Sequence, residues 1–192
     1  GRIGSLIPYI EKNFSVYADK DHRAIAGLSM GGGQSLKFGL GHMDVFAYVG
    51  GFSSAPNTMR AAQLIPDVDK VKKENKLLWM VCGGADGLMN NSAQLKAFCD
   101  EKGIPCTLIN YPDEGHNFVV WKYGLYNFAQ LIFKKEHKET LLCNRVIGAS
   151  PSPTLVVASS PQLEKPPKNW EKILHGVHKF ALNLRHVSAP RA

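Results

Sequence analysis

Three residues of this chain have types and an order that could perform nucleophilic chemistry. Ser29 stands at the centre of a Gly-x-Ser-x-Gly pattern, and Asp86 and His116 follow it along the chain. A serine hydroxyl is a weak nucleophile, so it needs a base to take its proton, and that base needs an orienting carboxylate. The sequence therefore predicts acyl-transfer chemistry with Ser29 as nucleophile, His116 as general base and then acid, and Asp86 as the residue that orients His116.

The glycines around Ser29 predict a sharp turn between a strand and a helix. A short apolar stretch precedes them and a helix-compatible stretch, 32–40, follows. Such a turn forces strained dihedral angles on the nucleophile, and we expect a side chain at Gly27 or Gly31 to clash with the crowded backbone. The backbone N–H of Met30, at the start of the helix, is expected to face a developing oxyanion. The alternative is an ordinary glycine-rich turn without chemistry.

Asp86 and His116 also have simpler interpretations. Asp86 precedes a glycine, and Asp-Gly pairs favour turns. Among the seven histidines, His116 alone lies in a glycine-flanked loop after a predicted strand and downstream of both other residues. Four further carboxylates are rival candidates for the orienting acid: Asp67, Asp69, Asp113 and Glu114.

The elements that must position these residues alternate between strands and helices. Apolar runs predict strands at 22–27, 46–50, 77–82 and 106–111, and helical periodicity predicts helices at 2–13, 32–40, 91–102 and 117–133. A glycine- and serine-rich loop is expected at 51–58, and a solvated helix or loop at 59–76. This alternation predicts an α/β fold with a mostly parallel sheet and helices on both faces. Ligands bind at the carboxyl ends of such strands, where all three candidate residues fall.

Charge divides the chain into two parts. The net charge is +7, but residues 1–133 hold 13 Lys and Arg against 12 Asp and Glu, whereas residues 134–192 hold 10 against 4. We interpret 1–133 as the folded core and 134–192 as a basic extension containing Pro and Ser, with room for one helix at 169–184. The basic extension lacks aromatic or motif support for nucleic-acid binding, so no nucleic-acid partner is expected.

Two further classes of protein find no support in the sequence. No apolar run approaches the ~20 residues of a membrane span, so we expect no membrane partner. The four cysteines, Cys82, Cys99, Cys106 and Cys143, form no Cys-x-x-Cys pair, and free thiols are the expectation rather than a metal site. Cys82 lies in an apolar strand and is expected in the core.

Several motifs together resemble one family of enzymes. They are HRAIAGLSMGG at 22–32, SAPNT at 54–58, GHNF at 115–118 and the Trp-Lys pair at 121–122. Over about residues 3–133 the chain resembles the esterase D-type α/β-hydrolases, nearest to bacterial feruloyl and acetyl xylan esterases of the carbohydrate esterase class. The resemblance implies a three-layer α/β-hydrolase fold and the catalytic residues Ser29, Asp86 and His116. It also implies hydrolysis of small or polysaccharide-linked acyl esters of plant cell-wall xylan, no metal or organic cofactor, and secretion, although the chain shows no signal peptide.

The chain departs from this family at its start. Such folds begin with several strands and a loop that supplies a second oxyanion N–H, whereas this sequence starts one helix before the nucleophile strand. We therefore expect an N-terminally truncated fold whose open sheet edge could pair with a second copy. Loss of one oxyanion donor typically costs ~2.7–4 kcal/mol of transition-state stabilisation.

Substrate contacts and the choice of reaction stay open at this stage. Trp121, Ser53 and Asn57 are candidates to line an aromatic acyl pocket, and Trp121 fits the core of its helix equally well. Other acyl hydrolases or acyltransferases of the same fold, of the S-formylglutathione hydrolase or enterobactin esterase type, are alternatives. A catalytically inactive fragment that acts only as a structural dimer is a third hypothesis.

Overall fold

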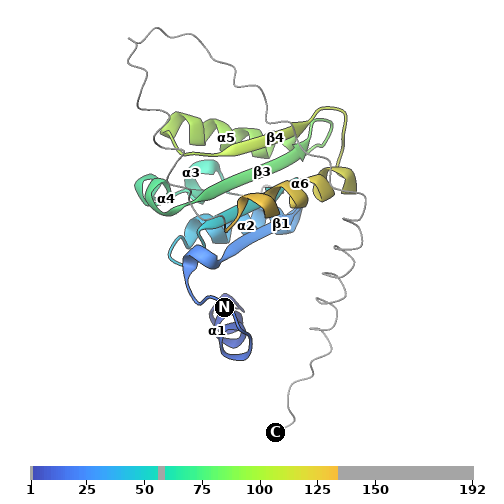
Figure 1. The fold of residues 1–192 in the computed structure, drawn as a ribbon. Helices are drawn as coiled ribbons and strands as arrows, with labels where there is room; N and C mark the ends of the chain where they lie inside the picture. Colours follow the sequence, from blue (N-terminus) through green and yellow to red (C-terminus); the bar gives the residue numbers. More distant parts are fainter. Residues whose placement is uncertain (1, 56–58, 134–192) are drawn as a thin grey trace, which may run out of the picture. The chain divides into compact units, whose positions relative to one another are not determined.

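The computed structural model of this protein describes residues 2–55 and 59–133 (Figure 1). The sequence expectations for Asn57, Cys143 and the extension 134–192, including its helix, lie outside the described residues.

A four-stranded parallel sheet is the centre of the fold. The strands are β1 (Ala24–Leu28), β2 (Tyr48–Phe52), β3 (Leu77–Gly83) and β4 (Thr107–Tyr111), and they lie side by side in chain order. All three neighbouring pairs are parallel. Both central strands are buried along nearly their whole length, as continuous apolar runs covered on two faces should be. The predicted parallel sheet is confirmed.

Helices cover both faces of this sheet and give three layers (Figure 1). One face carries α2 (Met30–Gly41), α3 (Ala61–Leu64), α4 (Val68–Glu74) and α5 (Met89–Lys102), and the other carries α6 (Phe118–Leu131). The core beneath the first group is built on aliphatic side chains such as Leu36, Met80 and Leu95. The core beneath α6 is aromatic, with Phe52, Trp79 and Phe128 in edge-to-face and tilted contacts.

The N-terminal segment reaches the edge of the sheet. The helix α1 (Arg2–Asn13) forms as its periodicity predicts, and a short 3₁₀ turn, η1 (Lys20–His22), leads into β1. Glu11 of α1 pairs with Arg23 just before β1. Among the described residues β1 has only β2 as a neighbour, so pairing of this edge with a second copy stays a prediction.

Element boundaries differ from the sequence-based prediction at several places. The first strand begins at Ala24 because residues 20–22 form the 3₁₀ turn, and β2 is shifted by two residues to include Gly51 and Phe52. A Cβ at Gly51 would come within 2.5 Å of the Ser54 hydroxyl, so a residue expected in a loop is instead a glycine required by packing. The segment 59–76 contains two short helices, α3 and α4, rather than one element.

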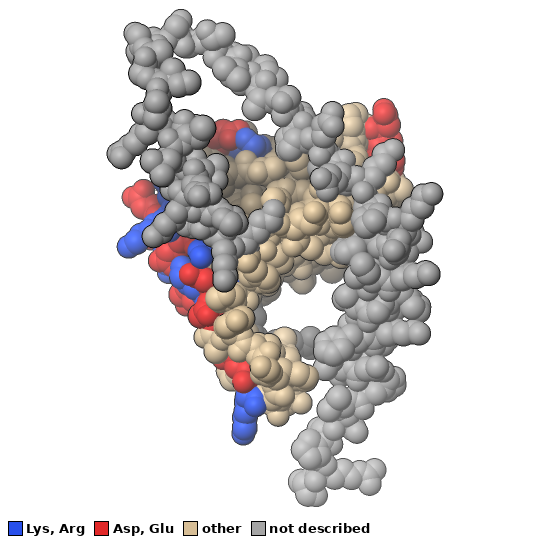
Figure 2. All heavy atoms as spheres, viewed as in Figure 1, with Lys and Arg blue, Asp and Glu red and all other residues tan. Residues whose placement is uncertain are grey.

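Part of the described surface visible in Figure 2 carries no charged side chains. In Figure 2 the Lys, Arg, Asp and Glu side chains of the described residues gather along the margins of this view, around a broad uncharged area. Among the described residues, no helix is both long enough and apolar enough to cross a membrane.

Candidate active site

Ser29 lies at the junction of β1 and α2, in a strained conformation. Its φ of 52° and ψ of −121° are unfavourable for any residue with a side chain. Backbone hydrogen bonds hold it there: Ser29 N–H donates to the carbonyl of Phe52 (2.8 Å), and its own carbonyl accepts from Gly33 (3.1 Å) and Ala55 (2.9 Å). The turn is therefore fixed both by its own helix and by the end of β2.

The glycines of this turn have different roles from those predicted. A Cβ at Gly27 would lie 2.5 Å from the carbonyl oxygen of Gly31, so the predicted clash at Gly27 is confirmed. The predicted clash at Gly31 is wrong, because a Cβ there would meet nothing within 4 Å. The second crowded position is Gly32, where a Cβ would lie 2.7 Å from the Ser54 hydroxyl and 2.9 Å from the Gly27 carbonyl oxygen.

His116 connects Ser29 and Asp86, which are far apart in sequence. Its Nε2 lies 3.1 Å from Ser29 Oγ, and its Nδ1 lies 2.8 Å from Asp86 Oδ2. An ionised carboxylate only accepts hydrogen bonds, so Nδ1 carries the proton of a neutral imidazole and Nε2 is left to accept from the serine hydroxyl. The three residues form one hydrogen-bonded chain at the carboxyl edge of the sheet.

Asp86 is buried but remains ionised. Its Oδ1 accepts a hydrogen bond from the backbone N–H of Leu88 at 2.9 Å. Burial by itself raises the pKa of this carboxyl, but hydrogen bonds from Leu88, His116 and Ser53 outweigh it and bring the pKa below its ordinary value of 3.8. At neutral pH a negative charge therefore lies beside the imidazole of His116.

The capped start of α6 also constrains the position of His116. Asn117 caps this helix, since its side-chain oxygen accepts from the N–H groups of Val119 (2.9 Å) and Val120 (3.4 Å). Its side-chain nitrogen donates to Glu114 at 2.8 Å. His116 thus directly precedes the capping residue of α6, and Glu114, one of the rival acids, accepts a hydrogen bond from that residue. Another rival, Asp67, caps α4 by accepting from Lys70 N–H.

Two aromatic side chains lie beside the histidine. The Trp121 ring is edge-to-face with His116 at a centroid distance of 4.9 Å, and the Phe118 ring is edge-to-face with Trp121 at 5.0 Å. The sequence motifs did not single out Phe118 as a site residue, and 69% of it is exposed. Its place in the first turn after His116 is the signal that could have marked it as a site residue.

Ser53 and Trp121, two of the predicted substrate contacts, differ in how far they are buried. Ser53 has no exposed surface, and its hydroxyl accepts a hydrogen bond from Trp121 Nε1 at 3.1 Å. The prediction that Ser53 touches the substrate is therefore wrong, because neighbouring side chains already enclose it. Trp121 is half-buried, packed on the site by its ring and on Ser53 by its nitrogen.

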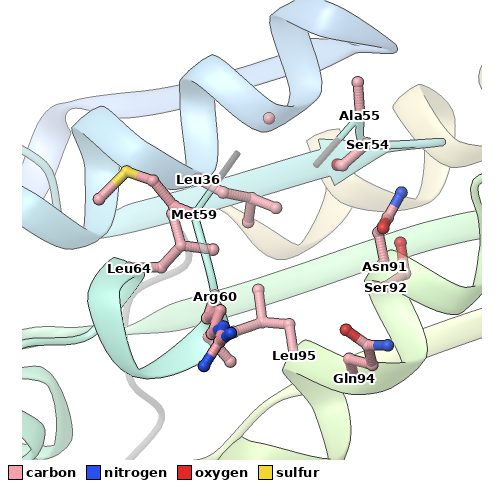
Figure 3. Close-up of a pocket in the computed structure, with 12 residues that line it drawn as sticks. Leu36, Ser54, Ala55, Met59, Arg60, Leu64, Asn91, Ser92, Gln94 and Leu95 are labelled. Carbon is pink, nitrogen blue, oxygen red and sulfur yellow. The ribbon is translucent and has the colours of Figure 1, made fainter. Parts of the chain in front are cut away.

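A separate cavity of about 230 Å³ lies between α2, α3 and α5 (Figure 3). Leu36, Leu64 and Leu95 form its apolar part, and Asn91, Ser92 and Ser54 lie at its polar end. The hydroxyls of Ser54 and Ser92 are buried without a hydrogen-bond partner. None of Ser29, Asp86 and His116 lines this cavity. Within the described part of the chain, no cluster of His, Cys, Asp or Glu could hold a metal ion.

The three layers, the parallel sheet and the strained serine between strand and helix define the class of α/β-hydrolases. Within that class the chain belongs to the Esterase family, whose model matches residues 4–127. It is 33% identical over 135 residues to an endo-1,4-beta-xylanase/feruloyl esterase of Xylanibacter ruminicola, an alignment covering 69% of this chain. The family resemblance drawn from the sequence motifs is confirmed.

Solved structures give the same result for the fold. A ferulic acid esterase is 29% identical, with a TM-score of 0.50 and 64% of this chain covered. A CE1 ferulic acid esterase from the anaerobic fungus Anaeromyces mucronatus is 23% identical, with a TM-score of 0.58 and 68% covered. The chain spans 17% of the Xylanibacter protein, 55% of the first solved structure and 51% of the second.

Proposed function

We propose that this chain carries the catalytic centre of a serine carboxylesterase that hydrolyses feruloyl or acetyl esters of xylan. The observation that carries the proposal is the continuous hydrogen-bonded chain from Ser29 Oγ through His116 to Asp86. Membership of the Esterase family and similarity to proteins named feruloyl esterase support the choice of ester chemistry.

The geometry supports a two-step reaction. His116 Nε2 takes the hydroxyl proton as Ser29 Oγ attacks the ester carbonyl, and the resulting imidazolium is stabilised by the charged Asp86 carboxylate. The tetrahedral intermediate collapses to an acyl-serine, and His116 returns the proton to the departing alcohol. A water molecule, deprotonated by the same nitrogen, then attacks the acyl-serine, releasing the carboxylic acid and restoring Ser29.

The strained turn also supplies a hydrogen-bond donor for the oxyanion that forms during this reaction. Met30 is the first residue of α2, so its backbone N–H belongs to the helix terminus whose N–H groups lack partners within the helix. We assign this N–H as one oxyanion donor, adjacent to the nucleophile, where charge develops in the intermediate. The positive φ of Ser29 is consistent with a turn whose conformation serves the site rather than stability.

The aromatic pair beside His116 supports an aromatic acyl group. Trp121 contacts the histidine ring, and Phe118 offers a largely exposed ring next to Trp121. A hydroxycinnamoyl ring could pack on this pair while its ester carbonyl lies at Ser29, whereas an acetyl group would not reach it. We therefore propose feruloyl esters as the preferred substrates.

The catalytic assignment is tested by hydrolysis of 4-nitrophenyl acetate by the 192-residue chain. We expect Ser29→Ala to lower kcat/KM by roughly a thousandfold or more, since nothing else supplies the attacking oxygen. The matched control is Ser15→Ala, which removes the hydroxyl of an exposed serine before β1 and should leave the rate unchanged. Equal rates for wild type and Ser29→Ala, both at background, would refute the proposed function.

The acyl preference is tested by comparing methyl ferulate with 4-nitrophenyl acetate. Phe118→Ala and Trp121→Ala should each lower the ferulate-to-acetate ratio of kcat/KM, by roughly threefold to tenfold, because an aromatic contact is worth about 0.5–1.5 kcal/mol. Phe38→Ala, which removes a partly exposed ring from α2, is the control. An unchanged ratio in both site variants would remove the aromatic pair from the acyl site.

A further inference from the structure

Ser53 follows the last residue of β2 and is held there in an unusual backbone conformation. Its φ is +44°, and its N–H donates to the carbonyl of Val81 at 2.7 Å, which continues the pairing between β2 and β3 by one residue. The residue has no exposed surface. Its hydroxyl is thereby enclosed beside β3, directly before the loop that carries Asp86.

Every hydrogen-bonding capacity of this hydroxyl finds a neighbour. The indole Nε1 of Trp121 can only donate, so Ser53 Oγ accepts from it at 3.1 Å. The Cys82 thiol donates to the same oxygen, with an Sγ to Oγ distance of 3.8 Å. Burial raises the pKa of this thiol to about 11, so it keeps its proton and remains a donor. The hydroxyl hydrogen is left for an acceptor, and Ser53 is one of the neighbours that lower the pKa of the Asp86 carboxyl.

Two side chains, Asp86 and Trp121, lie against His116. Asp86 binds the Nδ1 atom of the imidazole, at 2.8 Å, and the Trp121 ring packs edge-on against its plane, at a centroid distance of 4.9 Å. The imidazole is therefore positioned by one carboxylate and one indole, and the indole is hydrogen-bonded to the buried Ser53 hydroxyl.

We propose that Ser53 is a positioning residue, whose hydroxyl fixes the Asp86 carboxylate and the Trp121 indole relative to each other and so sets the orientation of His116. The inference rests on the proposed function, because it gives Asp86 and His116 their catalytic roles. Ser53 acts through these neighbours and does not touch the substrate. The same hydroxyl links the orienting acid to the aromatic side chain at the acyl site.

Kinetics of three variants test this role. Ser53→Ala removes the hydroxyl, and Ser53→Gly removes it while also relieving the positive φ, so glycine should fold at least as well as serine. We expect both to lower kcat for 4-nitrophenyl acetate by roughly tenfold to a hundredfold, with KM changed less than about twofold, as for loss of a hydrogen bond to a charged group. The control is Ser54→Ala, because Ser54 is the adjacent buried serine and its hydroxyl has no partner.

A spectroscopic measurement separates positioning from simple support of the fold. In ¹⁵N-resolved spectra, Ser53→Ala should shift the Trp121 indole N–H resonance, which Trp121→Phe identifies by its disappearance. In ¹³C spectra, Ser53→Ala should raise the titration midpoint of the Asp86 carboxyl, because a donor to its charged form is lost. Ser54→Ala should change neither signal.

Different experimental results would refute the proposed function and the positioning role of Ser53. An inactive wild-type chain would refute the proposed function. An active wild type with full kcat in Ser53→Gly would overturn the positioning role and leave only a backbone role for residue 53. Loss of activity with unmoved Trp121 and Asp86 signals would equally overturn it, since the hydroxyl would then not connect the two side chains.

Discussion

At the scale of single residues, two adjacent serines show how differently a buried hydroxyl can behave. Ser53 is surrounded by Trp121, Cys82 and Asp86, all able to share hydrogen bonds with it. Ser54 and Ser92 are equally buried, yet their hydroxyls have no partner. An unsatisfied buried hydroxyl is costly, whereas removing it can be neutral or stabilising.

Ser92, within α5, gives the prediction at this scale. We expect Ser92→Ala to raise the free energy of unfolding by about 0.5–1 kcal/mol, because it removes an unpaired polar group and alanine is the better helix former. Urea unfolding followed by circular dichroism measures this change. A loss of stability of similar size would mean that the hydroxyl is satisfied by a water molecule in the neighbouring cavity.

At the scale of elements, the turn from β1 to α2 depends on close packing of backbone against backbone. Gly27 faces the carbonyl of Gly31, and Gly32 faces the end of β2 and Ser54. These two glycines let the helix start directly above the strand, and this placement fixes Ser29 opposite His116. Gly31 contributes nothing comparable, although it belongs to the same sequence pattern.

This difference predicts opposite results for two neighbouring alanine substitutions. Gly27→Ala should lower the free energy of unfolding by about 1–3 kcal/mol and remove most esterase activity, since its Cβ meets backbone that cannot move freely. Gly31→Ala should keep activity within about twofold and stability at least equal, because its Cβ enters open space. Thermal unfolding and 4-nitrophenyl acetate hydrolysis measure both. Equal damage from the two substitutions would contradict the packing described here.

At the scale of the whole molecule, the site makes stability depend on pH. The pKa of Asp86 is lower in the folded chain than its ordinary value of 3.8, so its charged form stabilises the fold. That contribution is complete above about pH 4 to 5 and is lost as the pH falls through the lowered folded pKa. Neighbours from three places, Leu88, His116 and Ser53, produce the shift, so it arises only when the sheet is assembled.

The sign of this linkage predicts how Asp86→Asn behaves. Near pH 6 the variant should have a lower Tm than wild type, and the difference should shrink towards pH 3, because the wild type then loses the charge that asparagine never had. Thermal unfolding followed by circular dichroism across this range measures the trend. A Tm difference that is constant with pH would show that the Asp86 charge does not contribute to folding.

The local sequence determined the elements and the chemistry of the residues that end them. Alternating apolar runs and helical periods were enough for the parallel sheet and its covering helices, because each pattern reports which faces of one element are buried. The places of Ser29, Asp86 and His116, each after the end of a strand, were enough to assign them to one edge, because parallel strands end together. Boundaries were less certain, as β2 shows, since Gly51 packs not only against Ser54 but also against Leu36 of α2, which is distant in sequence.

Only the tertiary structure decided which residues meet behind that edge. Sequence patterns marked Ser53 as a substrate contact and Gly31 as crowded and did not single out Phe118, whereas the structure buries Ser53, leaves open space at Gly31 and exposes Phe118. Exposure at these positions depends on contacts between elements: Ser53, after β2, is enclosed and bonded to Trp121 of α6, whereas Phe118, the first residue of α6, is exposed. Residue type and spacing determined the reaction that this chain could perform, whereas packing between elements decided which side chains support it, because burial depends on contacts that no local pattern contains.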